Sequence, residues 1–395
     1  MSRLEELTNE AGAMRKDISA MAGQGGRTPL GELIQRYCPD GVEYKALKEA
    51  TIMKRGTSAT KGMMQEGDIP VISGGRQPAF YCDQANRTGE TITVAGSGAG
   101  AGYVQYWNEP IFVCDAFSIQ GDNTLLTKYI YYYLTSIQEK IYSTKKGGGV
   151  PHVHISSIDK FEIPVPPLPV QEEIVRILDS FTELQAELQA ELQKRKQQYN
   201  YYRDNLLSFN DINRGGYREE VRWMKMSEIC KSVKSGKCSD RNISGKYVVY
   251  GSTGIIAYSD SYQYDTENIL IARVGANAGY IHIAKGRYDV TDNTLIVELN
   301  NTGCTLKFVY YYLTTANINQ YAKGGGQPLI TSSTIKDLLI PIPSMEEQNR
   351  IVSILDRFDK LTNDLTSGLP AEIEKRRQQY EYYRDRLLTF RRINA

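Results

Sequence analysis

The sequence predicts an α+β protein with two mixed α/β domains separated by two long helices, which pair as an antiparallel coiled coil in a pseudo-two-fold duplicated arrangement. The main observation is a repeat, because residues 194–209 and 375–390 are identical at twelve of sixteen positions. A second repeat lies upstream, where residues 174–181 match residues 351–358. The repeats have helical periodicity, whereas the segments before them have the β-branched and aromatic composition of short strands.

The composition is typical of a globular protein with two cores. A chain of 395 residues is long enough for two domains of ordinary size. The net charge of +1 means that any surface for nucleic acid must be local. The six cysteines include no Cys-x-x-Cys pair, which argues against a zinc site or a disulfide framework and favours reduced thiols. No apolar run approaches the roughly 20 residues of a membrane span, so we expect a cytoplasmic protein without membrane contact.

The repeat divides the chain into five segments. Residues 1–28 form an N-terminal extension, which is either a native helix or an added segment. We predict a first globular domain at residues 29–165 and a central helix at residues 166–210. A second globular domain follows at residues 211–342, and a C-terminal helical region occupies residues 343–395.

The two globular segments correspond to each other at low identity. The matched positions are mostly glycine, tyrosine and aspartate: Gly74 with Gly251, Tyr81 with Tyr258, Gly98 with Gly275, Gly102-Tyr103 with Gly279-Tyr280, and Asp115 with Asp292. A shared frame with different surfaces indicates two recognition surfaces on one fold. This organisation is more typical of a binding protein than of an enzyme.

The long helices follow proline-rich exits from the globular domains. Proline lacks an amide hydrogen and restricts the residue before it, so residues 163–169 and 340–343 are predicted to be extended. Residues 171–209 contain no glycine or proline and carry apolar residues at helical spacing, which predicts a rod of roughly 58 Å. The second copy, residues 346–390, is the expected coiled-coil partner. Gly368 and Pro370 are expected to interrupt that second helix.

A four-residue tandem lies within the first helix, where Phe-Thr-Glu-Leu at residues 181–184 is followed by Gln-Ala-Glu-Leu at residues 185–188 and 189–192. Each unit adds about 6 Å and about 40° of rotation to a helix. Changing the number of units would therefore change the helix length in fixed steps. Ordinary Leu/Glu-rich coiled-coil sequence is the alternative explanation.

Residues 95–102, Ala-Gly-Ser-Gly-Ala-Gly-Ala-Gly, resemble a dinucleotide or S-adenosylmethionine fingerprint. A βαβ crossover needs a helix of about a dozen residues between these glycines and the next strand. Only residues 103–110 intervene before the next strand-like run, and they read as a strand and a turn. We therefore expect a tight turn, or a close approach to a ligand backbone, and no cofactor bound by this chain.

Basic glycine-rich loops occur at equivalent positions of the two halves, and they suit contact with duplex DNA. A solvated basic loop is the alternative. Two histidines in the first loop, His152 and His154, lack a third ligand, so a metal site is not expected. The candidate DNA-binding residues are Arg76, Gln77, Lys145, Lys146, His152, His154, Lys237, Arg241, Arg273, Lys323 and Gln327.

The repeated helix ends are rich in tyrosine and arginine. Aromatic residues on every side of a helix favour burial against other protein surfaces over a nucleic-acid strip. The candidate partner-binding residues are Tyr199, Tyr202, Arg203, Tyr380, Tyr383 and Arg384.

The sequence shows no catalytic constellation. It lacks an Asp/Asn-Pro-Pro-Tyr/Phe methyltransferase tetrad, a Walker loop and a nuclease cluster of carboxylates and lysine. With three histidines in all, a hydrolase triad is also hard to assemble. We therefore expect that the chain is not itself an enzyme.

Together these features resemble the specificity (S) subunit of type I restriction-modification systems. The resemblance covers residues 30–390 and depends on the two variable domains, the proline exits, the Ile-Val-x-Ile-Leu-Asp-x-Phe helices and the Lys-Arg-x-Gln-Gln-Tyr-x-Tyr-Tyr-Arg-Asp endings. The Gln-Ala-Glu-Leu tandem is similar to that of the IC subgroup, in which the repeat number sets the spacer length.

The resemblance implies a non-catalytic subunit whose two target-recognition domains each bind half of a split double-stranded DNA sequence. It further implies two methyltransferase (M) subunits that use S-adenosylmethionine, and restriction (R) subunits that use ATP and Mg²⁺. Two other classes of protein remain as alternatives. A stand-alone methyltransferase or nuclease would need a cofactor or metal site, and a coiled-coil scaffold would not explain two diversified domains with basic loops.

Overall fold

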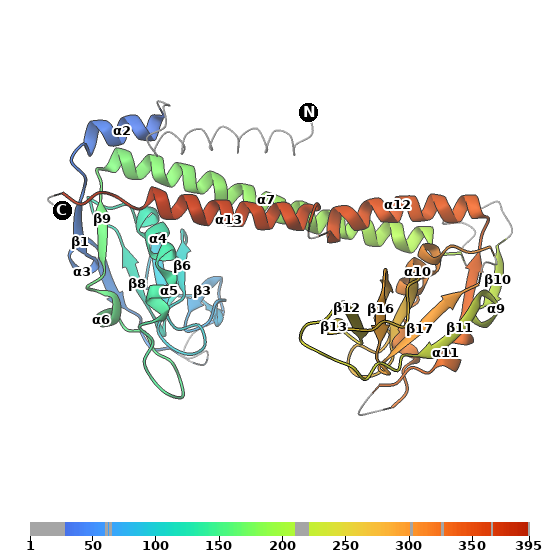
Figure 1. Ribbon diagram of the computed structural model, residues 1–395. Helices are drawn as coiled ribbons and strands as arrows, with labels where there is room; N and C mark the ends of the chain where they lie inside the picture. The colour runs from blue at the N-terminus through green and yellow to red at the C-terminus, as the bar shows by residue number, and fades with distance from the viewer. Residues whose placement is uncertain are drawn as a thin grey trace. The chain divides into compact units, whose positions relative to one another are not determined.

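The computed structural model describes residues 28–59, 62, 65–209, 221–300, 303–324, 328–364 and 366–393. The contacts divide the chain into two compact units (Figure 1). Unit 1 contains the residues up to Gln189 and those from Ile373 onward, and unit 2 contains Ala190–Glu372. The α+β class and the duplication are therefore confirmed, whereas the predicted boundaries of the five segments stay predictions.

Unit 1 is built from short strands and short helices before the long helix begins. Its elements before the long helix are α2 (Pro29–Tyr37), β1 (Glu43–Ala46), α3 (Leu47–Ala50), β2 (Ile52–Arg55), β3 (Ile69–Ile72), β4 (Phe80–Cys82), β5 (Thr91–Ala95), β6 (Val104–Trp107), β7 (Phe112–Val113), β8 (Ala116–Gln120), α4 (Thr127–Ser136), α5 (Gln138–Tyr142), α6 (Ile155–Ile158) and β9 (Glu162–Val165). Helix α2 begins with Thr28, whose hydroxyl accepts the Gly31 N–H at 3.1 Å.

Unit 2 repeats this order. Its elements are β10 (Arg222–Lys225), α9 (Met226–Ile229), β11 (Cys230–Ser235), β12 (Tyr247–Gly251), β13 (Gly254–Ser259), β14 (Asn268–Ala272), β15 (Ile281–Ala284), β16 (Tyr288–Val290), β17 (Thr294–Leu299), α10 (Leu306–Thr315), the 3₁₀ helix η2 (Ile318–Tyr321), α11 (Ser332–Lys336), β18 (Leu339–Ile342) and α12 (Met345–Asn363).

The sheet topologies of the two units are the same. Four-stranded antiparallel sheets have the orders β2-β8-β5-β6 and β11-β17-β14-β15, and three-stranded sheets have the orders β4-β3-β7 and β13-β12-β16. A two-stranded ribbon, β1-β9 or β10-β18, leads into the helical region. Glu43 pairs with Val165 and Arg222 with Ile342, so the proline exits are strands of these ribbons.

The long helices are α7 (Leu168–Leu206) and α13 (Leu369–Leu387), and α12 precedes α13. Helix α7 has 39 residues and begins at Leu168, inside the exit predicted to be extended as far as residue 169, because Pro169 lies in the first turn, where no amide hydrogen is needed. The second helical region is interrupted as predicted, since α12 ends at Asn363 and α13 begins at Leu369. None of the described helices combines the length and apolar character needed to cross a bilayer.

Within each unit, a phenylalanine from one repeat copy packs on two tyrosines of the other copy. In unit 1, where α13 runs antiparallel to the first part of α7 (Figure 1), the Phe181 ring lies 6.4 Å from Tyr380 and 5.7 Å from Tyr383, centroid to centroid. In unit 2 the equivalent Phe358 ring lies 6.4 Å from Tyr199 and 5.4 Å from Tyr202. The expected pairing of the duplicated helices is therefore present in both units.

The end of the chain closes unit 1. After α13, the Val42 N–H donates to the Arg391 carbonyl at 2.8 Å, and the Tyr44 hydroxyl donates to the Phe390 carbonyl at 2.9 Å. Arg392 forms a 2.7 Å ion pair with Glu162 on the neighbouring strand β9. Segments from the two ends of the sequence thus share one surface of unit 1.

Candidate nucleic-acid interface

A glycine turn joins β5 to β6 in unit 1. Gly98 and Gly102 have φ angles of +75° and +83°, a region that favours glycine. The Gly102 N–H donates to the Ala95 carbonyl at 2.7 Å, and a Cβ on Gly102 would lie 3.2 Å from a Val153 methyl group. The two strands are antiparallel neighbours, with Val94 opposite Val104. The segment is therefore a tight hairpin, as predicted, and not a dinucleotide-binding crossover.

A second hairpin, residues 146–152, packs on this turn. The N–H groups of Lys146 and His152 each donate to the other residue's carbonyl, at 3.0 and 2.8 Å. The Gly98 N–H donates to the Pro151 carbonyl at 3.0 Å, so the basic loop and the glycine turn are held together by backbone bonds. The His152 and His154 rings stack with centroids 5.9 Å apart. Four predicted residues, these two histidines with Lys145 and Lys146, thus lie in or next to one hairpin.

A third loop of unit 1, the one before β4, contacts the glycine turn. A Cβ on Gly100 would lie 2.3 Å from the Gly74 carbonyl oxygen, so the loop before β4 touches the glycine turn. The Arg76 guanidinium lies 4.9 Å from the centroid of the Tyr103 ring, and the Gln105 amide donates to the Arg76 carbonyl at 2.9 Å. Gln77 is exposed beside Arg76. The fold therefore brings the predicted residues of unit 1 to one group of loops.

Unit 2 has the same two hairpins. The N–H groups of Lys323 and Leu329 each donate to the other residue's carbonyl, at 3.0 and 2.9 Å, and the Gly275 N–H donates to the Pro328 carbonyl at 3.1 Å. The φ angles of the matched glycines agree, since Gly147 has +109° and Gly324 has +108°. Gln327 lies outside the described residues. The position of Lys323 therefore matches that of Lys146 in unit 1.

Two candidate arginines of unit 2 meet at Asp292. The Arg273 guanidinium donates to the Asp292 backbone carbonyl at 3.2 Å, and Arg241 lies 3.6 Å from the Asp292 carboxylate. The Arg273 carbonyl also accepts the Ile330 N–H at 2.8 Å, which joins this cluster to the basic hairpin. Lys237 is exposed between buried Gly236 and Cys238, and within the described part of unit 2 its side chain makes no hydrogen bond or ion pair to this cluster. Arg273 is thus joined through the backbone to the hairpin that contains Lys323, and Arg241 meets Arg273 at Asp292, whereas no such contact joins Lys237 to them.

The two hairpin lysines are available to an anion. Among the residues that the structure describes, neither Lys146 nor Lys323 has a carboxylate within ion-pair distance, and both side chains are exposed. Arg241 instead has a carboxylate partner in Asp292. A cation without an internal partner loses no existing ion pair when it binds a phosphate. Lys146 and Lys323 are therefore better placed than Arg241 for phosphate contact.

The helix ends carry the predicted partner-binding residues, but much of their surface is used inside the chain. Tyr383 is 9% exposed, and Tyr199 and Tyr380 pack against the two hydrophobic cores. Burial raises the pKa of Tyr380 to about 12. Sequence reasoning missed the neighbouring Tyr201 and Tyr382, which are 67% and 54% exposed. The helical period places them opposite the packed tyrosines, a signal that the sequence contained.

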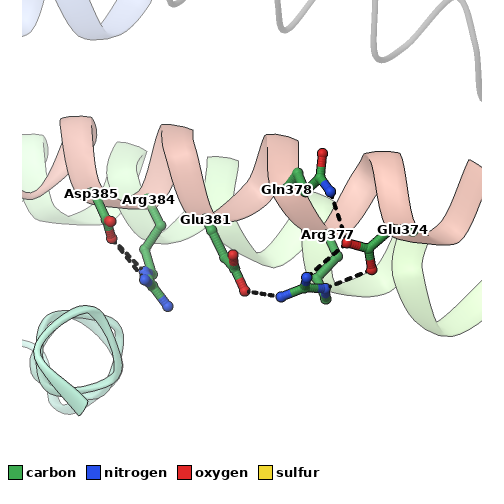
Figure 2. A network of polar contacts seen from close by, with 6 residues as sticks. All are labelled: Glu374, Arg377, Gln378, Glu381, Arg384 and Asp385. Atoms are coloured by element: carbon green, nitrogen blue, oxygen red, sulfur yellow. Dashed lines mark hydrogen bonds and ion pairs between the residues drawn. The ribbon is translucent and has the colours of Figure 1, made fainter. Parts of the chain in front are cut away.

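The outer side of α13 carries a network of charges (Figure 2). Arg377 pairs with Glu374 at 2.8 Å and with Glu381 at 2.6 Å, and Gln378 donates to Glu374 at 2.8 Å. Arg384 pairs with Asp385 at 2.7 Å, as Arg203 pairs with Asp204 at 2.8 Å in α7.

The Glu374–Glu381 network is specific to α13. The equivalent positions in α7 are Gln193, Lys196 and Asn200, which carry no acid. The two repeat copies therefore present different charges beside the same tyrosines.

The described residues form no group of three or more His, Cys, Asp or Glu side chains that could hold a metal ion. All six cysteines are free thiols. His282 lies between the rings of Tyr250 and Tyr280, at 5.2 and 5.8 Å, and burial lowers its pKa to about 4. This histidine is neutral near pH 7 and packs as an aromatic ring.

Comparison with known proteins agrees with this geometry. A family model described as "Type I restriction modification DNA specificity domain" matches residues 39–195 and again residues 218–375. The specificity subunit of the EcoR124I/EcoR124II type I restriction enzyme of Escherichia coli is 36% identical over an alignment 414 positions long, which covers 89% of this chain and 95% of the relative. A putative type I restriction enzyme specificity subunit of Haemophilus influenzae is 30% identical, with 88% and 96% covered.

Solved structures match as well. The crystal structure of a type I restriction-modification S subunit from M. genitalium aligns with a TM-score of 0.65 at 19% identity, and the alignment covers 88% of this chain and 96% of that one. At this identity the match supports the fold alone.

Proposed function

The chain belongs to the family of type I restriction-modification DNA specificity subunits, and we propose that each of its units binds one half of a bipartite DNA target through the paired hairpins described above. The observation that carries the proposal is the duplicated backbone. Gly98 bonded to Pro151 and Gly275 bonded to Pro328 hold the same two hairpins together in each unit. The residues around these hairpins differ, as expected where two half-sites differ in sequence.

Two kinds of DNA contact follow from this arrangement. Lys146 and Lys323, at equivalent positions, would contact phosphates, because phosphate contacts position a protein without reading sequence. Residues that differ between the units, such as His152 and Arg76 in unit 1 and Arg273 in unit 2, would contact base edges. The remaining candidates, namely Gln77, Lys145, His154, Lys237, Arg241 and Gln327, are proposed as further contacts.

The partner subunits are also part of the proposal. Two methyltransferase subunits would dock on the helical region and bring S-adenosylmethionine, and restriction subunits would join with ATP and Mg²⁺. The exposed Tyr201 and Tyr382 and the outer parts of Tyr202 and Arg384 support such docking, because aromatic and arginine side chains are enriched at protein interfaces. The chain itself would bind DNA and its partners without catalysing a reaction.

The test is the methylome of a host that expresses this chain with its cognate methyltransferase, compared with a host that expresses the methyltransferase alone. We expect a bipartite methylated adenine motif only when both are present. The motif would give both half-sites and the spacer. An assembled complex that adds no methylation would contradict the proposal of DNA recognition.

A further inference from the structure

Exposed residues that recur in both units need a reason other than sequence recognition. The inference rests on the proposed function, in which the two units bind different half-sites. Base-reading residues should then differ between the units, whereas residues that contact something common to both should be the same. An exposed residue whose side chain has no hydrogen bond or ion pair inside the described chain, and which still recurs, is therefore a candidate for a shared partner.

One such pair lies at the end of an edge strand in each unit. Tyr81 and Asp83 in unit 1 correspond to Tyr258 and Asp260 in unit 2. Strands β4 and β13, which contain the tyrosines, are edge strands of the two three-stranded sheets, and Figure 1 labels β13. Tyr81 is 55% exposed and Tyr258 is 39% exposed, and both aspartates are exposed.

The residue between each tyrosine and aspartate faces inward. Cys82 and Ser259 are both 0% exposed, as the alternation of side chains along a strand requires. Their side chains are bonded inside the unit: the Cys82 thiol donates to the Gln84 carbonyl at 3.1 Å, and the Ser259 hydroxyl donates to the Asp240 carboxylate at 2.9 Å. Internal packing therefore explains why the residue between each tyrosine and aspartate is buried.

The backbone behind the two strands is also matched. A Cβ on Gly67 would lie 2.4 Å from the Cys82 carbonyl oxygen, and a Cβ on Gly245 would lie 2.9 Å from the Ser259 nitrogen. Each strand end is thus held by a close glycine contact. The outward tyrosine and aspartate gain nothing from this contact.

Neither outward side chain has an internal partner. Within the ranges that the structure describes, no hydrogen bond or ion pair engages the side chains of Tyr81, Asp83, Tyr258 or Asp260. Other exposed apolar residues on β13 do not recur, because Ile255 and Ile256, which are 53% and 44% exposed, correspond to Pro78 and Ala79. The recurrence is therefore specific to the tyrosine and the aspartate.

Charge indicates the class of partner. The recurring charge is a carboxylate, because Asp83 and Asp260 are both exposed; in unit 1 Glu66 and Asp68 are also exposed on either side of Gly67, whereas in unit 2 Gly245 is followed by the exposed Lys246. A carboxylate beside a phosphate backbone would repel it, so the two recurring aspartates do not suit contact with DNA. A tyrosine beside a carboxylate suits a protein surface that presents lysine or arginine. The protein that both units would share is the methyltransferase subunit.

We propose that the strand ends Tyr81–Asp83 and Tyr258–Asp260 are two equivalent docking points, one on each unit, for a basic segment of the methyltransferase subunit. This contact lies on the globular part of each unit and would add to docking on the helices. It would hold one methyltransferase copy to each unit without reading DNA sequence.

The test uses the full chain with its cognate methyltransferase in four forms: wild type, Tyr81→Ser, Tyr258→Ser and the double variant. Ile255→Ser is the matched control, because Ile255 is also exposed on β13 and does not recur. The mass of the complex and its dissociation constants would be measured by native mass spectrometry over a methyltransferase titration. We expect each single variant to weaken one of two binding steps about tenfold, and the double variant to weaken both. The control should change neither step by more than about twofold.

A charge reversal tests the aspartate at each strand end. Asp83→Lys and Asp260→Lys should weaken the same two steps, and thermal unfolding of each variant would show that the chain remains folded. Unchanged assembly by all variants would overturn the docking site. Unchanged assembly with weaker binding of DNA by the complex would also overturn it, in favour of a contact to the DNA backbone. If the wild-type chain itself bound no methyltransferase, the proposed function would fail, and the docking site with it.

Discussion

The side-chain amide nitrogen of Gln171 donates a hydrogen bond of 2.7 Å to the carbonyl oxygen of Thr124. The same amide donates to the Pro166 carbonyl, and its oxygen accepts the Leu126 N–H at 2.9 Å. Gln348 makes the matching bonds in unit 2, to the carbonyls of Gly303 and Pro343 and from the Thr305 N–H. Both glutamines are 0% exposed, so one buried side chain fixes the start of a helix in each unit, α7 in unit 1 and α12 in unit 2.

Replacing either glutamine with leucine should destabilise its own unit. Gln171→Leu or Gln348→Leu would leave one N–H and two carbonyls without their partner, at a cost of about 2–4 kcal/mol in the free energy of unfolding. Urea unfolding would measure this cost. Gln189→Leu, at an exposed position of α7, is the control and should change the free energy by less than about 0.5 kcal/mol. Equal, small losses in all three variants would contradict the role given to the buried amides.

A methyl group at Gly279 should destabilise unit 2. Gly279 has a φ of +92°, and a Cβ there would lie 2.7 Å from the backbone nitrogen of Asn319. Gly279→Ala is expected to cost about 2 kcal/mol or more, because both the backbone angle and the contact are unfavourable. Gly148→Ala, where a Cβ would meet nothing within 4 Å, is the control and should be close to neutral. Thermal unfolding of both variants would measure the two changes in stability; equal stability of the two variants would contradict the prediction.

Acid should destabilise unit 2 through His282. Burial lowers the pKa of His282 from 6.5 to about 4. The unfolded chain therefore takes up a proton more readily than the folded chain, and the stability present above pH 6.5 is lost as the pH falls toward 4. The expected loss from this group at pH 5 is about 2 kcal/mol.

The variant His282→Gln should flatten this part of the pH profile of urea unfolding, whereas the double variant His152→Gln/His154→Gln should keep it. If the two variants had the same pH profile, the assignment to His282 would be wrong.

Lys323→Ala should weaken DNA binding by the assembled complex. The salt dependence should also fall, with the slope of log K against log salt concentration reduced by about 1, because one phosphate contact is removed. Sequence preference should stay unchanged, since a phosphate contact carries no base information. Lys194→Ala on α7 has the same change in charge away from the hairpins and should leave the slope unchanged. Fluorescence anisotropy at several salt concentrations would measure both effects.

Removing residues 185–188 should shorten the spacer between the two half-sites. Helix α7 is continuous from Leu168 to Leu206, and Phe181, Leu184, Leu188 and Leu192 are all buried. Losing four residues shortens a helix by about 6 Å, which corresponds to about one or two base pairs at 3.4 Å each. Inserting one further Gln-Ala-Glu-Leu unit should lengthen the spacer by the same amount. An unchanged spacer in the methylomes of both variants would show that the tandem does not set it.

Much of the fold followed from the repeats and their periodicity. The apolar residues of α7 recur at helical spacing, and Gly368 and Pro370 indicated the break before α13, because neither residue suits a helix interior. The glycine turn at Gly98–Gly102 could be distinguished from a dinucleotide site by the short distance to the next strand. These features depend on local chain geometry, which neighbouring residues impose.

The candidate site was harder to predict from the sequence, because its contacts join segments that lie far apart along the chain. Gly98 bonds to Pro151, and Arg76 packs on Tyr103, contacts that no periodicity indicates.

The sequence by itself determined the duplication, the two element types and the family, because identical side chains in matched order specify matched local structure. Only the tertiary structure decided which polar groups are used internally. It placed Gln171 and Gln348 in buried hydrogen-bond networks and gave Arg241 a carboxylate partner, and among the residues that it describes it left Lys146 and Lys323 without one. It also left Tyr81 and Tyr258 exposed on edge strands. Whether a polar side chain is used inside the chain or remains available to a partner depends on what folding brings within about 3 Å of it, and neighbours in sequence do not settle that.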